Sequence, residues 1–340
     1  MLAVLGARAM AQGFAGLGSD ADGYTLPAPA ASFQFPADHG PHPDFRIEWW
    51  YVTANLTAAD GTAYGVQWTL FRSALVPRAA PGWASRQIWF AHAGLTTADR
   101  QFAAQRRARG GIGQAGVTPS PFAAWIDDWQ LAGTDDLARL QMTARGDDFA
   151  YDLTLTADGP LVLHGDGGYS LKSPRGQASY YYSQPGYRVS GVLHLPGGPV
   201  QVTGQAWLDR EWSSQPLAPT QTGWDWVSLH LEDGAKLMVY RLRDSAAPDF
   251  VPATYVAPGG GARALPAGVV ALVPLHTSRV AGRRIPTAWR VTWPEGGVDL
   301  RLDALNPQSW MDTAPPYWEG PVQISGSHRG AGYLEMTGYD

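Results

Sequence analysis

The chain has 340 residues, enough for two domains of ordinary size or for one large β structure. Gly and Pro, at 40 and 27 residues, recur throughout and exclude long helices, so we expect a predominantly β protein. The formal charge is −5 and no run of Lys or Arg exceeds two residues, which argues against a nucleic-acid or an anionic-membrane surface. No apolar run approaches the roughly 20 residues that span a bilayer, so no transmembrane segment is expected.

The first residues resemble the end of a secretory signal. Leu2-Ala3-Val4-Leu5 is apolar, and Ala9-Met10-Ala11 has the small-x-small pattern of a cleavage site, although a charged start is missing. We expect residues 1–23 to be a signal-peptide remnant with a flexible N-terminus, and the protein to be periplasmic or secreted. Arg8 interrupts the apolar region, so an ordinary flexible N-terminus is the alternative. With no Cys in the chain, stability must come from the core, and thiol catalysis is excluded.

His39-x-x-His42 is the first arrangement that could suggest a metal ligand pair. Gly40, Pro41 and Pro43 favour a turn there, and the sequence nominates no further ligands. We therefore expect a solvated or backbone-bonded loop, with no metal and no cofactor.

Glu48-Trp49-Trp50-Tyr51 lies in the first clear strand, expected from Glu48 to Leu56. In a strand, successive side chains point to opposite faces, so both faces carry large aromatics. Such a pattern indicates burial on one side and a lined cavity on the other. Residues 64–72 form the expected antiparallel partner, joined through a hairpin turn at Asp60-Gly61. The further expected strands cover residues 149–156, 180–182, 189–195, 200–208, 224–231, 236–243, 269–272, 288–293, 298–302 and 322–325.

Helix is expected only in two short pieces, Phe102 to Arg109 and a turn at Asp135 to Leu140. Gly111-Ile112-Gly113-Gln114-Ala115-Gly116 fits a dinucleotide-binding fingerprint in spacing. We reject that interpretation because residues 106–109 do not look like a strand and Pro119 forbids a long helix afterwards. The polar, Pro-punctuated run from Ser213 to Thr220 is the best domain boundary.

Four Trp-rich segments resemble the hydroxyneurosporene synthase (carotenoid 1,2-hydratase) and AttH-like family. They are His42-Pro-Asp-Phe-Arg-Ile-Glu-Trp-Trp-Tyr51, Gln67-Trp-Thr-Leu-Phe-Arg72, Trp207-Leu-Asp-Arg-Glu-Trp212 with Gly223-Trp-Asp-Trp226, and Tyr317-Trp-Glu-Gly320 with Gly332 to Tyr339. The resemblance spans nearly the whole chain and is strongest to the exported, AttH-like branch. It implies an all-β fold of two consecutive lipocalin-like antiparallel β-barrel domains with little helix, at residues 24–212 and 213–340.

The resemblance also implies a range of activities. The family includes hydratases of acyclic carotenoids, pericyclic cyclases and exported proteins described loosely as hydrolases. Arg210 stands where the hydratase branch tends to carry His, which argues against hydratase activity. No Ser has Gly at both i−2 and i+2, and there is no Cys, so a Ser or Cys hydrolase is not expected.

Hydration of an isolated alkene needs a carboxylic acid that stays protonated near neutral pH inside an apolar site. The candidate acids are Glu48, Asp209, Glu211 and Asp225, each close to Trp side chains whose ring faces stabilise cations. Their alternative role is structural, as partners of Arg46, Arg72, Arg210, Arg241 or indole N–H groups. The candidate ligand-binding residues are Trp49, Trp50, Tyr51, Gln67, Tyr181, Trp212, Trp224, Trp226, His230 and Tyr240, with His230 more typical of a hydrogen-bonded core or wall residue than of a proton shuttle.

Three functions follow as hypotheses. The first is an exported protein that binds an apolar small molecule, such as a polyene, isoprenoid or lipid, in a barrel or interdomain pocket. The second is an enzyme, either a hydratase acting on a C=C bond or a pericyclic cyclase. The third is an accessory protein of a membrane transporter complex.

Overall fold

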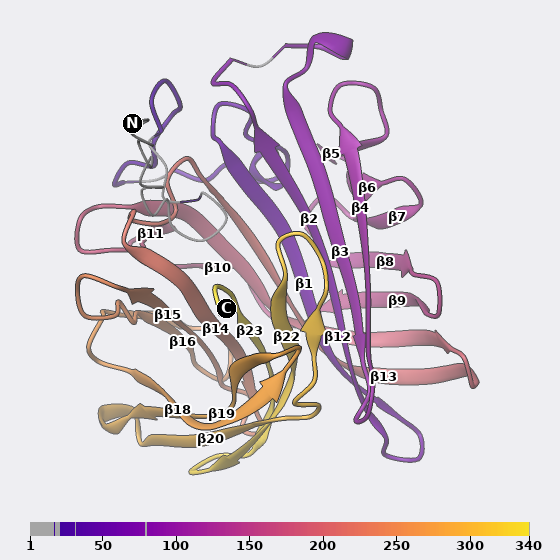
Figure 1. Cartoon of the computed structure of the whole chain (residues 1–340), viewed down its shortest axis with the longest axis vertical. Coiled ribbons are helices and arrows are strands. Elements are labelled where there is room, and N and C mark those ends of the chain that lie inside the picture. Colours follow the sequence, from indigo (N-terminus) through magenta and orange to yellow (C-terminus); the bar gives the residue numbers. More distant parts are fainter. Residues whose placement is uncertain (1–16, 18–20, 31, 79, 340) are drawn as a thin grey trace, which may run out of the picture.

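The computed structural model describes residues 17, 21–30, 32–78 and 80–339, and Figure 1 shows that strands dominate this part of the chain. Its helical elements are the short 3-10 turns Ala37–His39, Gly82–Ala84 and Pro294–Gly296. The prediction of an all-β protein with little helix is confirmed. The expected cleavage site at residues 9–11 lies outside the described residues. No helix in the described ranges is both long and apolar enough to cross a bilayer.

The first sheet has thirteen antiparallel strands in the order β4-β3-β2-β1-β13-β12-β9-β8-β7-β6-β5, with β10 and β11 paired to β12. Its strands are β1 (Ile47–Ala58), β2 (Ala63–Ala74), β3 (Gln87–Thr96), β4 (Gln101–Arg109), β5 (Ala115–Pro119), β6 (Phe122–Ile126), β7 (Trp129–Gly133), β8 (Arg139–Arg145), β9 (Ala150–Ala157), β10 (Val162–Leu163), β11 (Tyr169–Leu171), β12 (Ala178–Leu195) and β13 (Gly198–Ser213).

The second sheet has ten strands in the order β17-β16-β15-β14-β23-β22-β20-β19-β18, with β21 paired to β22. Its strands are β14 (Gln221–Leu231), β15 (Lys236–Asp244), β16 (Ala253–Val256), β17 (Ala262–Leu265), β18 (Ala271–Val280), β19 (Arg283–Trp293), β20 (Val298–Ala304), β21 (Trp310–Met311), β22 (Tyr317–Gly326) and β23 (Gly330–Met336). Both sheets curl, and the segment from Ser213 to Gln221 joins them (Figure 1).

Three apolar clusters hold the molecule together. One fills the concave side of the first sheet, a second fills the second sheet, and the third lies between the sheets. The third consists of Tyr51, Tyr181, Trp207, Leu217, Trp226, Met238, Tyr240, Leu242 and Tyr333. The two faces of β1 serve different clusters: Trp50 and Val52 point into the first core, and Tyr51 points toward the second sheet. The prediction that this strand is buried on one face and lines a cavity on the other is confirmed.

One local prediction is wrong, and another is right as a turn but not as helix. Residues 102–109 are not helical but belong to β4, where Phe102 and Ala108 are buried and Ala103, Gln105 and Arg107 are exposed. This is a period of two, and pairing with β3 outweighs the helix propensity of the alanines. The second expected helical piece is a turn followed by β8.

The dinucleotide fingerprint is rejected correctly, but for a partly wrong reason. A strand, β4, does precede Gly111, yet the strand β5 follows where a phosphate-binding helix would be needed. Gly111 has a different role in the fold. Its φ is +84°, and a Cβ there would lie 2.2 Å from the carbonyl oxygen of Gly82, so only glycine allows these two turns to pack together.

Candidate functional site

A cavity of about 440 Å³ lies between the two sheets. One wall is the face of β1, β2, β3, β12 and β13 that points away from the first core. The other wall comes from β14, β15, β22 and β23, and the joining segment contributes Pro216 and Leu217. Two segments about 180 residues apart in sequence, β1 and β14, therefore build one site.

Strand register explains why the first wall is aromatic. Residues directly opposite each other in antiparallel strands point to the same face. One row across the sheet runs through Phe90, Phe71, Trp49, Glu211 and Tyr181. All five line the cavity, and the rings of Phe71 and Phe90 stack with centroids 4.6 Å apart.

The next row of the same sheet brings polar groups into the cavity. It runs through His92, Thr69, Tyr51 and Asp209, and each of these residues lines the cavity. The first wall thus has an aromatic row with a polar row beside it. Trp49 and Tyr51 lie two residues apart on β1 and face the same side, so each lies in one row with the residues opposite it on the neighbouring strands.

The second wall has a row of its own. Glu335 on β23 lies opposite Trp226 on β14, which lies opposite Tyr240 on β15. The rings of Trp226 and Tyr51 meet edge to face across the cavity, with centroids 5.5 Å apart. This contact joins the two sheets at the site.

Lys172 and Glu211 form an ion pair in the cavity wall, with Nζ 2.8 Å from Oε1. The ammonium group also lies over the rings of Tyr181 and Tyr240, 4.7 and 4.3 Å from their centroids. Burial opposes the charge, but the carboxylate of Glu211 outweighs it and raises the pKa of Lys172. The lysine is therefore a fixed cation rather than a nucleophile.

Asp209 is a buried acid with no basic partner among the described residues. Its Oδ1 accepts hydrogen bonds from Ser183 Oγ and from Trp207 Nε1, the latter at 2.7 Å. Burial raises the pKa of Asp209 to about 7, although these donors favour the charged form. Near neutral pH this carboxyl is protonated in part of the molecules.

Glu335 is a second such acid, partly exposed to the cavity. Trp224 Nε1 donates to its Oε1 at 2.6 Å, and burial raises the pKa of Glu335 to about 7. Glu319 lies directly opposite it on β22 and is fully buried. Burial and the nearby Glu335 raise the pKa of Glu319 well above its usual range, and the Tyr51 hydroxyl donates to its Oε1. Neither of these facing acids forms an ion pair with a base in the described part of the chain, and burial favours the protonated form of both.

His92 and Tyr317 form the remaining polar part of the lining. His92 Nδ1 lies 3.1 Å from the Tyr317 hydroxyl, which also accepts from Gln67 Nε2 at 3.3 Å. Burial lowers the pKa of His92 to about 4, so its imidazole is neutral at neutral pH.

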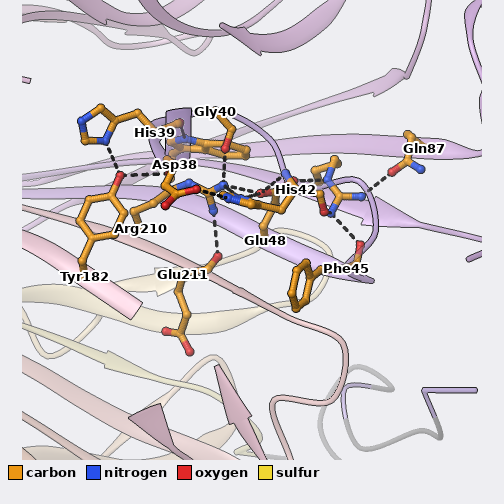
Figure 2. A network of polar contacts seen from close by, with 12 residues as sticks. Asp38, His39, Gly40, His42, Phe45, Glu48, Gln87, Tyr182, Arg210 and Glu211 are labelled. Carbon is orange, nitrogen blue, oxygen red and sulfur yellow. Dashed lines mark hydrogen bonds and ion pairs between the residues drawn. The ribbon is translucent and has the colours of Figure 1, made fainter. Parts of the chain in front are cut away.

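Glu48, the first predicted acid, lies on the opposite face of β1, away from the cavity, in the polar network drawn in Figure 2. Its carboxylate accepts hydrogen bonds from Arg72 Nε, from Arg210 Nη2 and from the backbone N–H of His42, the last at 3.0 Å. Burial alone would raise the pKa of Glu48, but the charges of Arg210 and Arg72 hold it well below its usual range. Glu48 is therefore an ionised partner of two buried arginines.

The loop with His39 and His42 belongs to the same network, which corrects the expectation of a solvated or backbone-bonded turn. His39 is buried, and its Nδ1 lies 2.6 Å from the Tyr182 hydroxyl (Figure 2). His42 lies within 3.2 Å of Asp38 and 3.3 Å of Glu48. Among the described residues, no cluster of His, Asp and Glu has the arrangement of a metal site.

The structure brings eight of the fourteen sequence-predicted residues to the cavity: Trp49, Tyr51, Tyr181, Asp209, Glu211, Trp224, Trp226 and Tyr240. Six lie elsewhere: Glu48, Trp50, Gln67, Trp212, Asp225 and His230. Trp50 is in the first core, Trp212 stacks on His42 with centroids 3.9 Å apart, and Gln67 is buried beside Thr69. His230 is buried and donates from Nε2 to the carbonyl of Pro185 at 2.7 Å, as expected of a hydrogen-bonded core residue.

Sequence reasoning missed Lys172, His92, Tyr317, Glu319 and Glu335. The last three lie in the Trp-rich segments, so a search of those segments for acids and phenols would have found them. Lys172 and His92 carry no local signal.

Comparisons with known proteins agree with this architecture. A model of the AttH-like family matches residues 26–339. The crystal structure of a protein from Nitrosomonas europaea assigned to AttH shares 35% sequence identity, with a TM-score of 0.82 over 93% of this chain and 100% of that one. Kievitone hydratase from Nectria haematococca has 17% identity and a TM-score of 0.69, over 92% of this chain and 95% of that one. A structure of CghA with Sch210972 has 15% identity and a TM-score of 0.55, with the same two coverages. The last two likenesses establish a shared fold. A search of curated proteins gave no significant match.

Proposed function

This chain belongs to the AttH-like family, and we propose that it binds an apolar small molecule in the cavity between its sheets and adds water to a C=C bond of that molecule. A volume of about 440 Å³ falls in the range of small-molecule sites, and the aromatic rows suit a polyene or isoprenoid. The fold is shared with a hydratase, kievitone hydratase, which is compatible with this chemistry.

The observation that carries the proposal is a pair of carboxyl groups, Asp209 and Glu335, that reach an aromatic cavity with pKa values raised to about 7. Protonation of an alkene needs an acid that keeps its proton near neutral pH. An ordinary exposed carboxyl, with a pKa near 4, would hold almost none. A pure carrier of apolar ligands has no use for such groups, since each destabilises the fold when it ionises.

We assign the proton donor to Glu335 rather than Asp209. Asp209 is 2% exposed, and its Oδ1 already accepts from two donors, so a ligand has little access to it. Glu335 accepts from Trp224 and is partly exposed to the cavity. The Tyr51 hydroxyl interacts with both Glu335 and the protonated Glu319. After Glu335 has given up its proton, Glu319 can therefore supply another one through Tyr51.

In the proposed reaction, Glu335 transfers its proton to one alkene carbon, which forms a C–H bond and leaves a positive charge on the neighbouring carbon. The ring faces of Trp224, Trp226 and Tyr51 stabilise that charge, each by ~0.5 to 2 kcal/mol depending on desolvation. Water then forms the C–O bond, and its surplus proton passes to a neutral base. His92 lines the same cavity and is neutral, so it can accept this proton.

The test offers the purified protein a panel of acyclic polyenes and isoprenoids in isotopically labelled water, and follows the products by mass spectrometry. We expect a product that has gained one labelled water. Glu335→Gln keeps the shape of the side chain and can still accept from Trp224, so it should bind the same compounds. Its turnover should fall by about 100- to 10,000-fold, the usual contribution of a general acid.

Glu232→Gln is the matched control, because Glu232 is exposed beyond the end of β14. Binding is followed separately by the quenching of cavity Trp fluorescence. Binding without turnover in the wild type would reduce the function to that of a carrier. Neither binding nor turnover across the panel, or full turnover by Glu335→Gln, would refute the proposal.

A further inference from the structure

The connection between β2 and β3 exposes large apolar side chains at the end of the first sheet. It projects beyond the neighbouring strands in Figure 1. Trp83 is 73% exposed and Leu75 is 57% exposed, and Val76, Ile88 and Ile112 are also exposed. An exposed Trp beside several exposed aliphatic residues is unusual on a free surface and marks an interaction site.

Four exposed arginines lie in this connection or on the adjoining strand β4: Arg78, Arg86, Arg107 and Arg109. Among the described residues, none of them forms an ion pair with an acid. Residues 61–126 contain seven arginines and a single acid, Asp99, which lies in the turn at the far end of β3. This segment of the chain is therefore cationic, although the chain as a whole carries a charge of −5.

The fold gathers these arginines from separate strands. Arg109 lies opposite Ile88, and Arg107 lies opposite Phe90, so both face the same side as the cavity lining. Arg109 also donates to the carbonyl of Trp83, and its guanidinium lies over the Trp83 ring at 5.8 Å. An anionic-membrane surface is not expected from the sequence, because the sequence has no long run of Lys or Arg. Arginines that are far apart in the chain and come together only by strand pairing do not form such a run.

The apolar surface continues from the connection into the cavity. Ile88 pairs with Ser73, and the next cavity-facing pair is Phe90 with Phe71. Ser73, Phe71 and Phe90 line the cavity. An apolar molecule that leaves a membrane at the exposed connection would therefore meet Ile88 and then Phe90 and Phe71 on its way to the cavity.

We propose that this end of the first sheet docks on the surface of a lipid bilayer that contains anionic lipids. Trp83 and Leu75 enter the interface between headgroups and acyl chains, and the arginines contact the anionic headgroups. A lipid surface fits better than a protein partner because the arginines share a segment with the apolar residues, and its single acid, Asp99, lies at the far end of β3. The docking does not depend on which reaction, if any, the cavity performs.

The test measures flotation of the purified protein with lipid vesicles. We expect binding to vesicles of phosphatidylcholine mixed with phosphatidylglycerol, weaker binding to phosphatidylcholine alone, and loss of the difference at high salt. Trp83→Ala should abolish flotation, and Arg86→Gln should weaken binding about fivefold, as expected for one basic residue near an anionic surface. Leu275→Ala and Arg284→Gln, two exposed changes on the second sheet, should behave as the wild type.

Each variant also requires a thermal melt, which should not move because Trp83 and Arg86 are exposed. Equal flotation with both kinds of vesicle, or wild-type flotation of Trp83→Ala, would overturn the proposal. The same surface could instead bind a second copy of the chain, and sedimentation velocity detects such a dimer. A dimer that Trp83→Ala dissociates, together with no flotation of the wild type, would likewise overturn it.

Discussion

Replacement of Glu48 by Gln tests whether this residue is a structural anion rather than a catalytic acid. Gln keeps the size of the side chain but removes the charge that neutralises Arg72 and Arg210, which are 1% and 0% exposed. Removal of one partner from a buried ion pair costs about 3 to 5 kcal/mol. For a folding unit of roughly 200 residues, 1 kcal/mol shifts the melting temperature by about 2 to 4 °C. We therefore expect Glu48→Gln to lower the Tm by about 6 to 20 °C at pH 7.

The measurement is calorimetry or urea unfolding, with Glu232→Gln as an exposed control that should change the free energy of unfolding by less than about 0.5 kcal/mol. The pH dependence adds a second criterion. The pKa of Glu48 is lowered on folding, so its stabilising contribution is present above the pKa of the unfolded chain and is lost as the pH falls. The difference between wild type and variant should shrink below about pH 4.

The result should also separate structure from chemistry. At a temperature where the variant is folded, it should bind the cavity ligand as the wild type does, because Glu48 lies on the other face of β1. A Tm within 2 °C of the wild type (roughly 1 kcal/mol or less) would refute the ion-pair argument. A variant of normal stability that lost only turnover would return Glu48 to the catalytic candidates.

Three further predictions concern the cavity and the turns. Asp209→Asn should stabilise the protein at pH 8 but not at pH 4. The pKa of Asp209 is raised on folding, so the wild type loses stability as the pH rises from about 4 to 7, and the variant does not. Urea unfolding of both proteins across this pH range measures the difference in the free energy of unfolding. Trp224→Phe removes a donor to Glu335 and should raise its pKa, so the alkaline limb of the pH–rate profile should move to higher pH; no movement would contradict the role of Glu335. Gly111→Ala forces a Cβ toward the carbonyl of Gly82 at a positive φ and should lower the free energy of unfolding by about 1 to 3 kcal/mol, measured by urea unfolding.

The tertiary structure also explains the role of Arg210, whose presence in place of His is evidence from the sequence against hydratase activity. Its guanidinium contacts Glu48 and lies over the Trp50 ring at 3.9 Å, and it is fully buried on the side of the first core. Figure 2 shows Glu211, the next residue, pointing away from that network. Because neighbouring residues of β13 face opposite sides, the identity of residue 210 affects the core network and not the cavity. The objection to hydratase chemistry based on this position therefore has less force.

The sequence by itself determined the class of fold and the position of about half of the strands. Alternation of apolar and polar residues depends only on the backbone geometry of a strand, so β1 and its hairpin with β2 could be read from the chain. The same alternation is present in β4, but alanine and arginine favour a helix, so local propensity and period predict different structures there. The Trp-rich segments carried the family resemblance, which the family match over residues 26–339 confirms.

Only the tertiary structure decided which residues of those segments meet at a site. Glu48 and Trp49 are neighbours in sequence, yet one faces the first core and the other the cavity. The raised pKa of Glu335 depends on burial between two sheets and on the negative charge of Glu211, which lies on the other sheet. Arg109 likewise reaches Ile88 and Trp83 only through the pairing of β3 with β4. Local sequence fixes the direction of a side chain along its strand, but burial and charge at a site depend on segments that only folding brings together.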